Sequence, residues 1–121
     1  MINRRLALVF TMLSVALLPA MSAPPSHADD HAVFSPAPGV VCGHTFCVDK
    51  QGISFGLTAL YLGDQAQDKL LSEGLVNLTE FTLDNGIFCD TKQQLCYLDR
   101  YFDAHGQRSP VSEKYTAMLF G

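Results

Sequence analysis

Short apolar runs separated by turn residues predict a chain rich in β-hairpins. Gly39-Val40-Val41-Cys42 and Gly86-Ile87-Phe88-Cys89 are similar apolar runs, and a second cysteine follows each of them after a short stretch. Asn85-Gly86 stands between two apolar runs, which is a strong hairpin signal. We therefore predict two related hairpins, the first at 39–49, with the second sheet region continuing through 96–102.

Three further segments carry helix signals, and the first and third of them have apolar residues at three- and four-residue intervals, the pattern of one face of a helix. The apolar positions are Ile53, Leu57, Leu60 and Tyr61 in the first segment, Leu70 and Leu71 in the second, and Val111, Tyr115, Met118 and Leu119 in the third. The expected start signals are Ser54 for the first, Asp64 with Gln67 in a capping box for the second, and Ser109 before Pro110 for the third. Gly63 and Gly74 are placed to end the first two. The sequence thus predicts a small α+β fold, an antiparallel sheet of two disulfide-stapled hairpins with about three short helices on one face.

The first 28 residues have the layout of a secretory signal peptide. Arg4 and Arg5 give a positive start, and an apolar run of 13 residues follows at 6–18. The run is too short for a transmembrane helix, which needs about 20 apolar residues. We predict cleavage after Ala28, with cleavage after Ser22 as the alternative. The mature protein is then periplasmic and has no transmembrane segment.

Removal of this peptide leaves 93 of the 121 residues, with six Lys+Arg against twelve Asp+Glu. Nucleic-acid binding uses a basic surface, so the acidic balance argues against it. Residues 29–38 contain Ser35-Pro36-Ala37-Pro38 and no periodicity, which predicts a flexible N-terminal arm. Residues 39–121 then form a single small domain, whose limited core would gain from covalent links.

All four cysteines lie in the part that survives cleavage, and an even number in an oxidising compartment predicts two disulfides. Four residues separate Cys42 from Cys47, and six separate Cys89 from Cys96. An even gap lets two cysteines face each other across a hairpin, so we predict local pairing. Cross-pairing remains the alternative, because a disulfide that closes a longer loop removes more entropy from the unfolded chain. Neither gap fits a zinc site or a thiol oxidoreductase well.

Two patterns suggest chemistry. Gly52-Ile53-Ser54-Phe55-Gly56 matches G-x-S-x-G, but that nucleophile elbow requires a large parallel sheet, so we interpret Ser54 as a helix cap. Cleavage after Ala28 would start the mature chain at Asp29-Asp30-His31. Its amine, two amides and the His31 imidazole could hold Cu(II) or Ni(II) in a square plane. We predict no catalytic residue and no cofactor.

Charged and aromatic residues are interleaved at Asp99-Arg100-Tyr101-Phe102-Asp103. This pattern is typical of a strand with one buried face. The alternative is a recognition surface, in which Arg100 and Tyr101 are of residue types that dominate binding energy at interfaces. His44, in the loop of the first hairpin, is a further candidate contact.

Several segments together resemble a known family. They are Cys47-Val48-Asp49, Gly52-Ile53-Ser54, Tyr61-Leu62-Gly63, Asn85-Gly86-Ile87-Phe88-Cys89-Asp90, Cys96 with Asp99-Arg100-Tyr101-Phe102, and Leu119-Phe120-Gly121. The chain resembles the YcgJ-type, Fels prophage protein-like family of small exported bacterial proteins over nearly all of its mature length. The resemblance implies a Gram-negative periplasmic setting and an uncharacterised role, and it transfers no catalytic residue.

The leading hypothesis is a non-catalytic, disulfide-stapled periplasmic domain that binds another protein or an envelope component. The alternative is a periplasmic Cu(II)- or Ni(II)-binding module that uses Asp29, Asp30 and His31. A small enzyme would need a concave pocket with converging polar groups.

Overall fold

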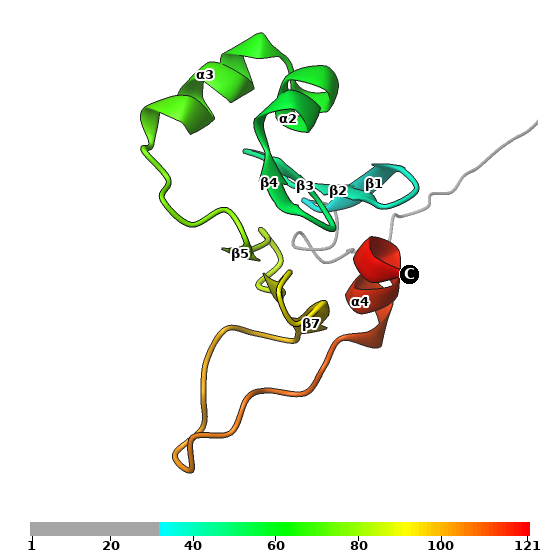
Figure 1. Cartoon of the computed structure of the whole chain (residues 1–121), viewed down its shortest axis with the longest axis vertical. Helices are drawn as coiled ribbons and strands as arrows, with labels where there is room; N and C mark the ends of the chain where they lie inside the picture. Colours follow the sequence, from blue (N-terminus) through cyan, green and yellow to red (C-terminus); the bar gives the residue numbers. More distant parts are fainter. Residues whose placement is uncertain (1–31) are drawn as a thin grey trace, which may run out of the picture.

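The computed structural model describes residues 32–121, and these residues alternate short strands with three helices (Figure 1). The strands are β1 (Phe34–Ala37), β2 (Val40–Cys42), β3 (Cys47–Asp49), β4 (Gly52–Ser54), β5 (Glu80–Thr82), β6 (Phe88–Asp90) and β7 (Leu95–Tyr97). The helices are α2 (Phe55–Leu62), α3 (Asp64–Ser72) and α4 (Glu113–Phe120). Two antiparallel sheets result, sheet A in the order β1-β2-β3-β4 and sheet B in the order β5-β6-β7. The predicted α+β class is confirmed.

Each predicted hairpin is closed by its own disulfide, so local pairing is confirmed. Cys42 is bonded to Cys47 and Cys89 to Cys96, with the Cα atoms 4.0 Å apart in both pairs. In each pair the two residues lie directly opposite each other in the strand register. All four side chains are fully buried, so the sulfur atoms also fill the core.

Sheet A extends into the segment expected to be a flexible arm. Strand β1 pairs with β2, with Phe34 opposite Cys42 and Ala37 opposite Val40. The Ser35 hydroxyl donates to the Val40 carbonyl oxygen at 2.7 Å, which holds the irregular turn together. The expected domain start at residue 39 is therefore corrected, because Phe34–Ala37 belongs to the sheet. The prolines of this segment argued for a loop. They fit the observed structure because β1 is an edge strand, where proline is tolerated.

Helix α2 has the predicted start and end, but its buried side differs from the prediction. The Ser54 hydroxyl accepts a hydrogen bond from the Leu57 N–H at 3.0 Å, which confirms the cap. Ile53, however, belongs to β4, while Leu60 is 69% and Tyr61 37% exposed. Because α2 is apolar on every side, periodicity could not show which side faces the sheet.

The starts of α3 and α4 also differ from those predicted. Asp64 is the first residue of α3 and not its cap, and Gln67 donates its side-chain N–H to the Phe55 carbonyl oxygen in place of a capping box. Helix α4 is capped by Ser112, whose hydroxyl accepts from the Tyr115 N–H. The predicted start at Ser109 is wrong because the intervening Val111 pairs with β7 as a strand residue.

The two sheets and the helices that follow them repeat one structural unit, here called unit 1 (residues 34–63) and unit 2 (residues 80–121). Each unit has an outer strand, a disulfide-linked hairpin, a fourth strand position, a serine cap and a helix. Three residue pairs of unit 1 have a counterpart in unit 2. Phe34–Cys42 corresponds to Phe81–Cys89, Val41–Val48 to Phe88–Tyr97, and Val48–Ile53 to Tyr97–Val111. The similarity of the two cysteine segments therefore reflects a repeated fold.

The helices of the two units match residue by residue. Leu57-Thr58-Ala59-Leu60-Tyr61-Leu62-Gly63 corresponds to Tyr115-Thr116-Ala117-Met118-Leu119-Phe120-Gly121. In each, the glycine N–H donates to the alanine carbonyl oxygen at 3.0 Å. The threonine hydroxyl accepts, at 2.9 Å, the N–H of the second cysteine of its own hairpin. One hydrogen bond, buried in unit 1 and partly buried in unit 2, thus ties each helix to its disulfide hairpin.

The units stack with α4 packed against both sheets, through β2 and β7, and Figure 1 shows α2 above sheet A, with α4 and sheet B side by side below it. The disulfide face of sheet A packs against Leu57 and Leu62 of α2. Alternate residues point to the opposite face, where Val41 and Val48 pack with Leu119 of α4. Cys89 and Cys96 of sheet B belong to this same main core. The second unit therefore covers the face that the first leaves open.

A single carboxylate also connects the two units. Asp84, in the turn between β5 and β6, accepts a hydrogen bond from the backbone N–H of His44 in the first hairpin. A Cβ at Gly43 would collide with the same carboxylate oxygen, so the close approach requires glycine here.

We expect Thr58→Val to lower the free energy of unfolding by about 1–3 kcal/mol, because valine has the same shape but leaves the buried Cys47 N–H without its acceptor. Thr116→Val should cost less, since Thr116 is only half-buried and water can replace the hydroxyl. Urea unfolding of both variants measures the difference. An equal or larger loss for Thr116→Val would contradict the role assigned to the buried hydroxyl.

We expect Gly43→Ala to cost about 1–3 kcal/mol in unfolding free energy, because the new methyl group displaces the Asp84 carboxylate. In an Asp84→Ala background the same change should cost markedly less, since the clash is absent. A double-mutant cycle measured by urea unfolding tests this coupling, and strictly additive losses would rule it out.

Candidate functional site

The connection from β7 to α4 is a long hairpin, the 98–110 hairpin, which projects from the lower end of the molecule (Figure 1). Its two arms are held together by hydrogen bonds. The Leu98 N–H donates to the Pro110 carbonyl oxygen at 2.9 Å, and the Asp99 N–H donates to the Ser109 hydroxyl at 3.1 Å. At its tip, the Asp103 carboxylate accepts from the backbone N–H groups of His105 and Gln107. The segment predicted as a plain strand is therefore an ordered projection.

Arg108 fixes this hairpin to the outer face of sheet B. Its guanidinium carbon lies 4.2 Å from the ring centre of Phe102, 4.7 Å from that of Phe88 and 5.0 Å from that of Tyr97. A guanidinium within about 6 Å of an aromatic ring is attracted by the negative face of the ring. Phe88 and Tyr97 are themselves stacked across the two strands. Arg108 therefore works as a structural clamp.

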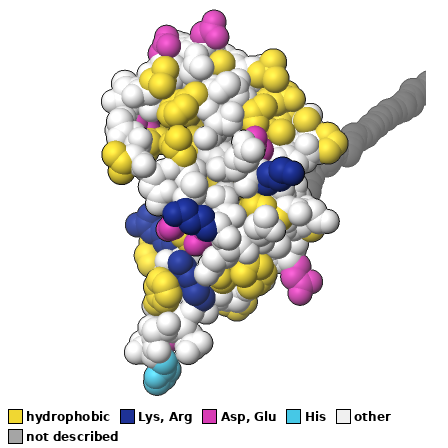
Figure 2. All heavy atoms as spheres, viewed as in Figure 1, with side chains coloured by type: hydrophobic (Ala, Val, Ile, Leu, Met, Phe, Trp, Pro, Cys, Tyr) yellow, Lys and Arg dark blue, Asp and Glu magenta, His cyan; other side chains and the backbone are white. Residues whose placement is uncertain are grey.

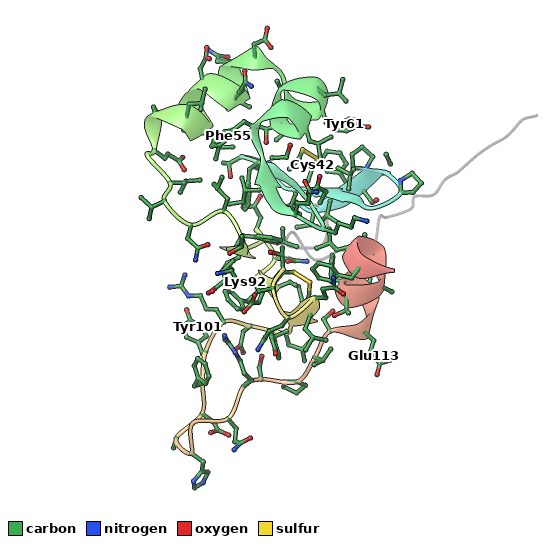
Figure 3. The ribbon with its side chains drawn as sticks, in the orientation of Figure 1. Cys42, Phe55, Tyr61, Lys92, Tyr101 and Glu113 are labelled. Atoms are coloured by element: carbon green, nitrogen blue, oxygen red, sulfur yellow. A yellow bond between two sulfur atoms is a disulfide. The ribbon has the colours of Figure 1, made fainter. Side chains whose placement is uncertain are left out.

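Other side chains of the hairpin point to solvent. Tyr101 is 65%, Phe102 57% and Leu98 51% exposed. Arg100 is also exposed, and its guanidinium lies 5.4 Å from the ring centre of Tyr101. Figure 3 shows Tyr101 at the side of the hairpin, below sheet B. The two residues predicted as contacts thus stand together on one projecting element.

A groove of about 430 Å³ borders Arg100 and continues upward to α3. Its lining is Thr45, Phe46, Ile53, Leu70, Glu73, Leu75, Asn77, Glu80, Phe81, Thr82, Phe88 and Arg100. Phe46 and Phe81 meet edge to face, with ring centres 6.2 Å apart. The charged side chains are one cation, Arg100, and two acids, Glu73 and Glu80. Figure 2 shows hydrophobic patches beside Lys, Arg and acidic side chains on the visible face.

This lining combines a mainly apolar surface with a few polar and charged groups. Its charged side chains are Glu73, Glu80 and Arg100, and its hydroxyl groups come from Thr45 and Thr82. An apolar surface with a few charged groups at its border is a composition common to binding surfaces.

His44 lies beside this groove but does not line it. Its neighbours Thr45 and Phe46 do, and its own backbone N–H is bound to Asp84. The structure therefore brings the first hairpin turn and Arg100 to one groove, although they are more than fifty residues apart in sequence. Phe46, Phe81 and Arg108 were missed as functional candidates because nothing in the local pattern shows which aromatics share a surface.

A larger cavity of about 890 Å³ lies between the turns of sheet A and the end of α4. Its charged residues are Asp49 and Lys50, and its floor includes Leu57, Met118 and Phe120. None of the predicted contact residues lines it, so the groove beside Arg100 remains the better candidate.

The predicted metal site falls on a part of the chain that the structure does not describe. Asp29, Asp30 and His31 lie outside the described residues, so the metal site stays a prediction from sequence. Within residues 32–121, no group of three His, Cys, Asp or Glu side chains could hold a metal ion. In that same range, no helix is long and apolar enough to span a membrane.

The comparisons with known proteins agree with the resemblance drawn from the sequence. Residues 33–120 match the family model of the YcgJ protein. A relative from Escherichia coli (strain K12), named Uncharacterized protein YcgJ, is 48% identical over 87 residues, which cover 71% of this chain and 71% of the relative. No solved structure matches the chain. Since the family model spans both disulfide hairpins and all three described helices, the chain belongs to the YcgJ family.

Proposed function

We propose that this protein is an exported, non-catalytic periplasmic domain that binds another protein or an envelope component through the 98–110 hairpin and the adjoining groove. The observation that carries the proposal is the difference between the two units. In unit 1 the turn Lys50-Gln51 joins the third and fourth strand positions. In unit 2 the same two positions are joined by eleven residues, 99–109, between Leu98 and Pro110.

The short turn shows that the extra length is not needed to close this strand pair. The register on both sides is the same, with Val48 opposite Ile53 in unit 1 and Tyr97 opposite Val111 in unit 2. Long ordered loops in small domains are commonly functional. The insertion is therefore the part of unit 2 that a binding role explains best.

The exposed residues of the insertion have the chemistry of a protein interface. Tyrosine and arginine are enriched among the residues that dominate binding energy. Tyr101 and Phe102 present large apolar area at low entropic cost, and their hairpin is already ordered by the hydrogen bonds between its arms. A rigid, aromatic projection beside an apolar groove fits a partner surface that can receive it.

Export is supported by two independent features of the chain. The first 28 residues have the layout of a signal peptide, and cleavage after Ala28 or Ser22 removes the apolar run. Both disulfides are buried in the core, and such bonds persist in oxidising compartments. A periplasmic location accounts for both.

A photo-crosslinking amino acid at Tyr101, in protein exported by its native host, should capture one specific component. The matched control places the same amino acid at Leu71, which is 54% exposed but does not line the groove. Arg100→Glu should weaken the captured complex about 30-fold or more, as expected for a residue at the centre of an interface. Mass spectrometry of the crosslinked product identifies the component.

Equal crosslinking from Leu71 would count against this site, as would capture from Tyr101 that Arg100→Glu leaves unchanged. The variants must first show two disulfides and a wild-type thermal transition, so that loss of binding cannot come from loss of folding.

A further inference from the structure

The outward face of α2 lacks the cover that the corresponding face of α4 has. Leu119 of α4 is 3% exposed because it packs with Val41 and Val48 on the open face of sheet A. The residue of α2 that corresponds to Leu119 is Tyr61, which is 37% exposed. One position earlier, Met118 of α4 is half-buried, whereas its counterpart in α2, Leu60, is 69% exposed. Helix α3 packs beside α2 but leaves these two side chains open. Figure 3 shows Tyr61 projecting outward from α2.

The matching sheet face lies at the opposite end of the stack, where the chain itself covers it. Phe88 and Tyr97 of sheet B occupy the positions that Val41 and Val48 occupy in sheet A. In sheet A these positions are covered by the next helix, α4. In sheet B they are covered by the Arg108 guanidinium and by the 98–110 hairpin, and they are 9% and 6% exposed.

We propose that the outward face of α2 is a docking site for the outer face of sheet B of a second copy, and that the 98–110 hairpin is the cap that keeps this contact closed. The chain itself supplies the precedent, because its internal interface joins the same kind of helix face to the same kind of sheet face. Both complementary surfaces occur in every copy at opposite ends, so the contact is head-to-tail.

The charges of the two surfaces agree with this assignment. Helix α2 has the sequence FGLTALYL and carries no charged residue, so nothing on it repels an apolar sheet face. On the aromatic pair of sheet B, the nearby charge is the guanidinium of Arg108. Stacks of repeated units need a polar cap on the last unit to remain soluble. Arg108 supplies a charge at one end, whereas α2 supplies none at the other.

The test replaces the cap with the short turn of unit 1. In the full chain, residues 98–110 are exchanged for Asp-Lys-Gln-Gly, the residues at 49–52, which close the same register. Sedimentation velocity is measured over a range of concentrations for this chimera, for Arg108→Ala and for the unchanged protein. We expect the unchanged protein to stay monomeric and the chimera to form concentration-dependent oligomers, with Arg108→Ala associating more weakly.

Leu60→Glu within the chimera separates specific docking from general stickiness. It should weaken association about tenfold or more, whereas Leu71→Glu, at an exposed position on the neighbouring helix, should leave association unchanged. Mass spectrometry confirms both disulfides in each variant before measurement. If the chimera does not fold, the same pair of changes is made in Arg108→Ala.

The proposal is overturned if the uncapped variants remain monomeric, if Leu71→Glu disrupts the oligomers as strongly as Leu60→Glu, or if the unchanged protein already associates through Leu60. It stands apart from the proposed function, because Leu60→Glu in the unchanged chain should leave crosslinking from Tyr101 intact. Loss of either result therefore does not imply loss of the other.

Discussion

Each half of the molecule depends on a threonine hydroxyl that joins a helix to a disulfide hairpin. Thr58 accepts the Cys47 N–H at 2.9 Å and donates to the Ser54 carbonyl oxygen at 2.7 Å. Thr116 accepts the Cys96 N–H at the same distance. The N–H of each of these second cysteines donates to the threonine hydroxyl, and a buried unpaired N–H would cost about as much as a lost hydrogen bond. The threonine removes that cost and ties the helix to its hairpin.

The disulfides and the stacking follow from how little apolar material the chain has. Each strand of the hairpins is three residues long, and three-residue strands bury few side chains. Cystine sulfurs fill one face of each sheet, and the opposite face must be covered by something else. In sheet A that cover is α4, and in sheet B it is an arginine held among three aromatic rings. The repeated unit thus has its open sheet face covered by a helix in one copy and by an arginine in the other.

Most local features of the fold were predictable from the sequence, apart from the starts of α3 and α4, and the long-range features were not. The hairpins, the local disulfides and the Ser54 cap depend on residues within a few positions of one another, and the structure confirms them. Strand β1 was missed because its prolines indicate a loop unless the neighbouring strand is known. The groove could not be predicted, since Phe46, Phe81 and Arg100 meet only after the two units stack. The repeated Thr-Ala segments of α2 and α4 were the signal in the sequence that could have shown this stacking.

The position of the insertion also follows from the stacking. In unit 1 the equivalent turn, Lys50-Gln51, borders the large cavity against the end of α4, where extra residues would have to compete with Met118 and Phe120. In unit 2 the same turn lies at the free end of the stack, so a longer connection meets only solvent and the outer face of sheet B, where Phe88 and Tyr97 lie. An insertion there can cover Phe88 and Tyr97 with one of its sides and present Arg100 and Tyr101 on the other. The cap and the candidate contact surface are therefore two faces of one element, and any partner that binds Tyr101 touches the hairpin that closes sheet B.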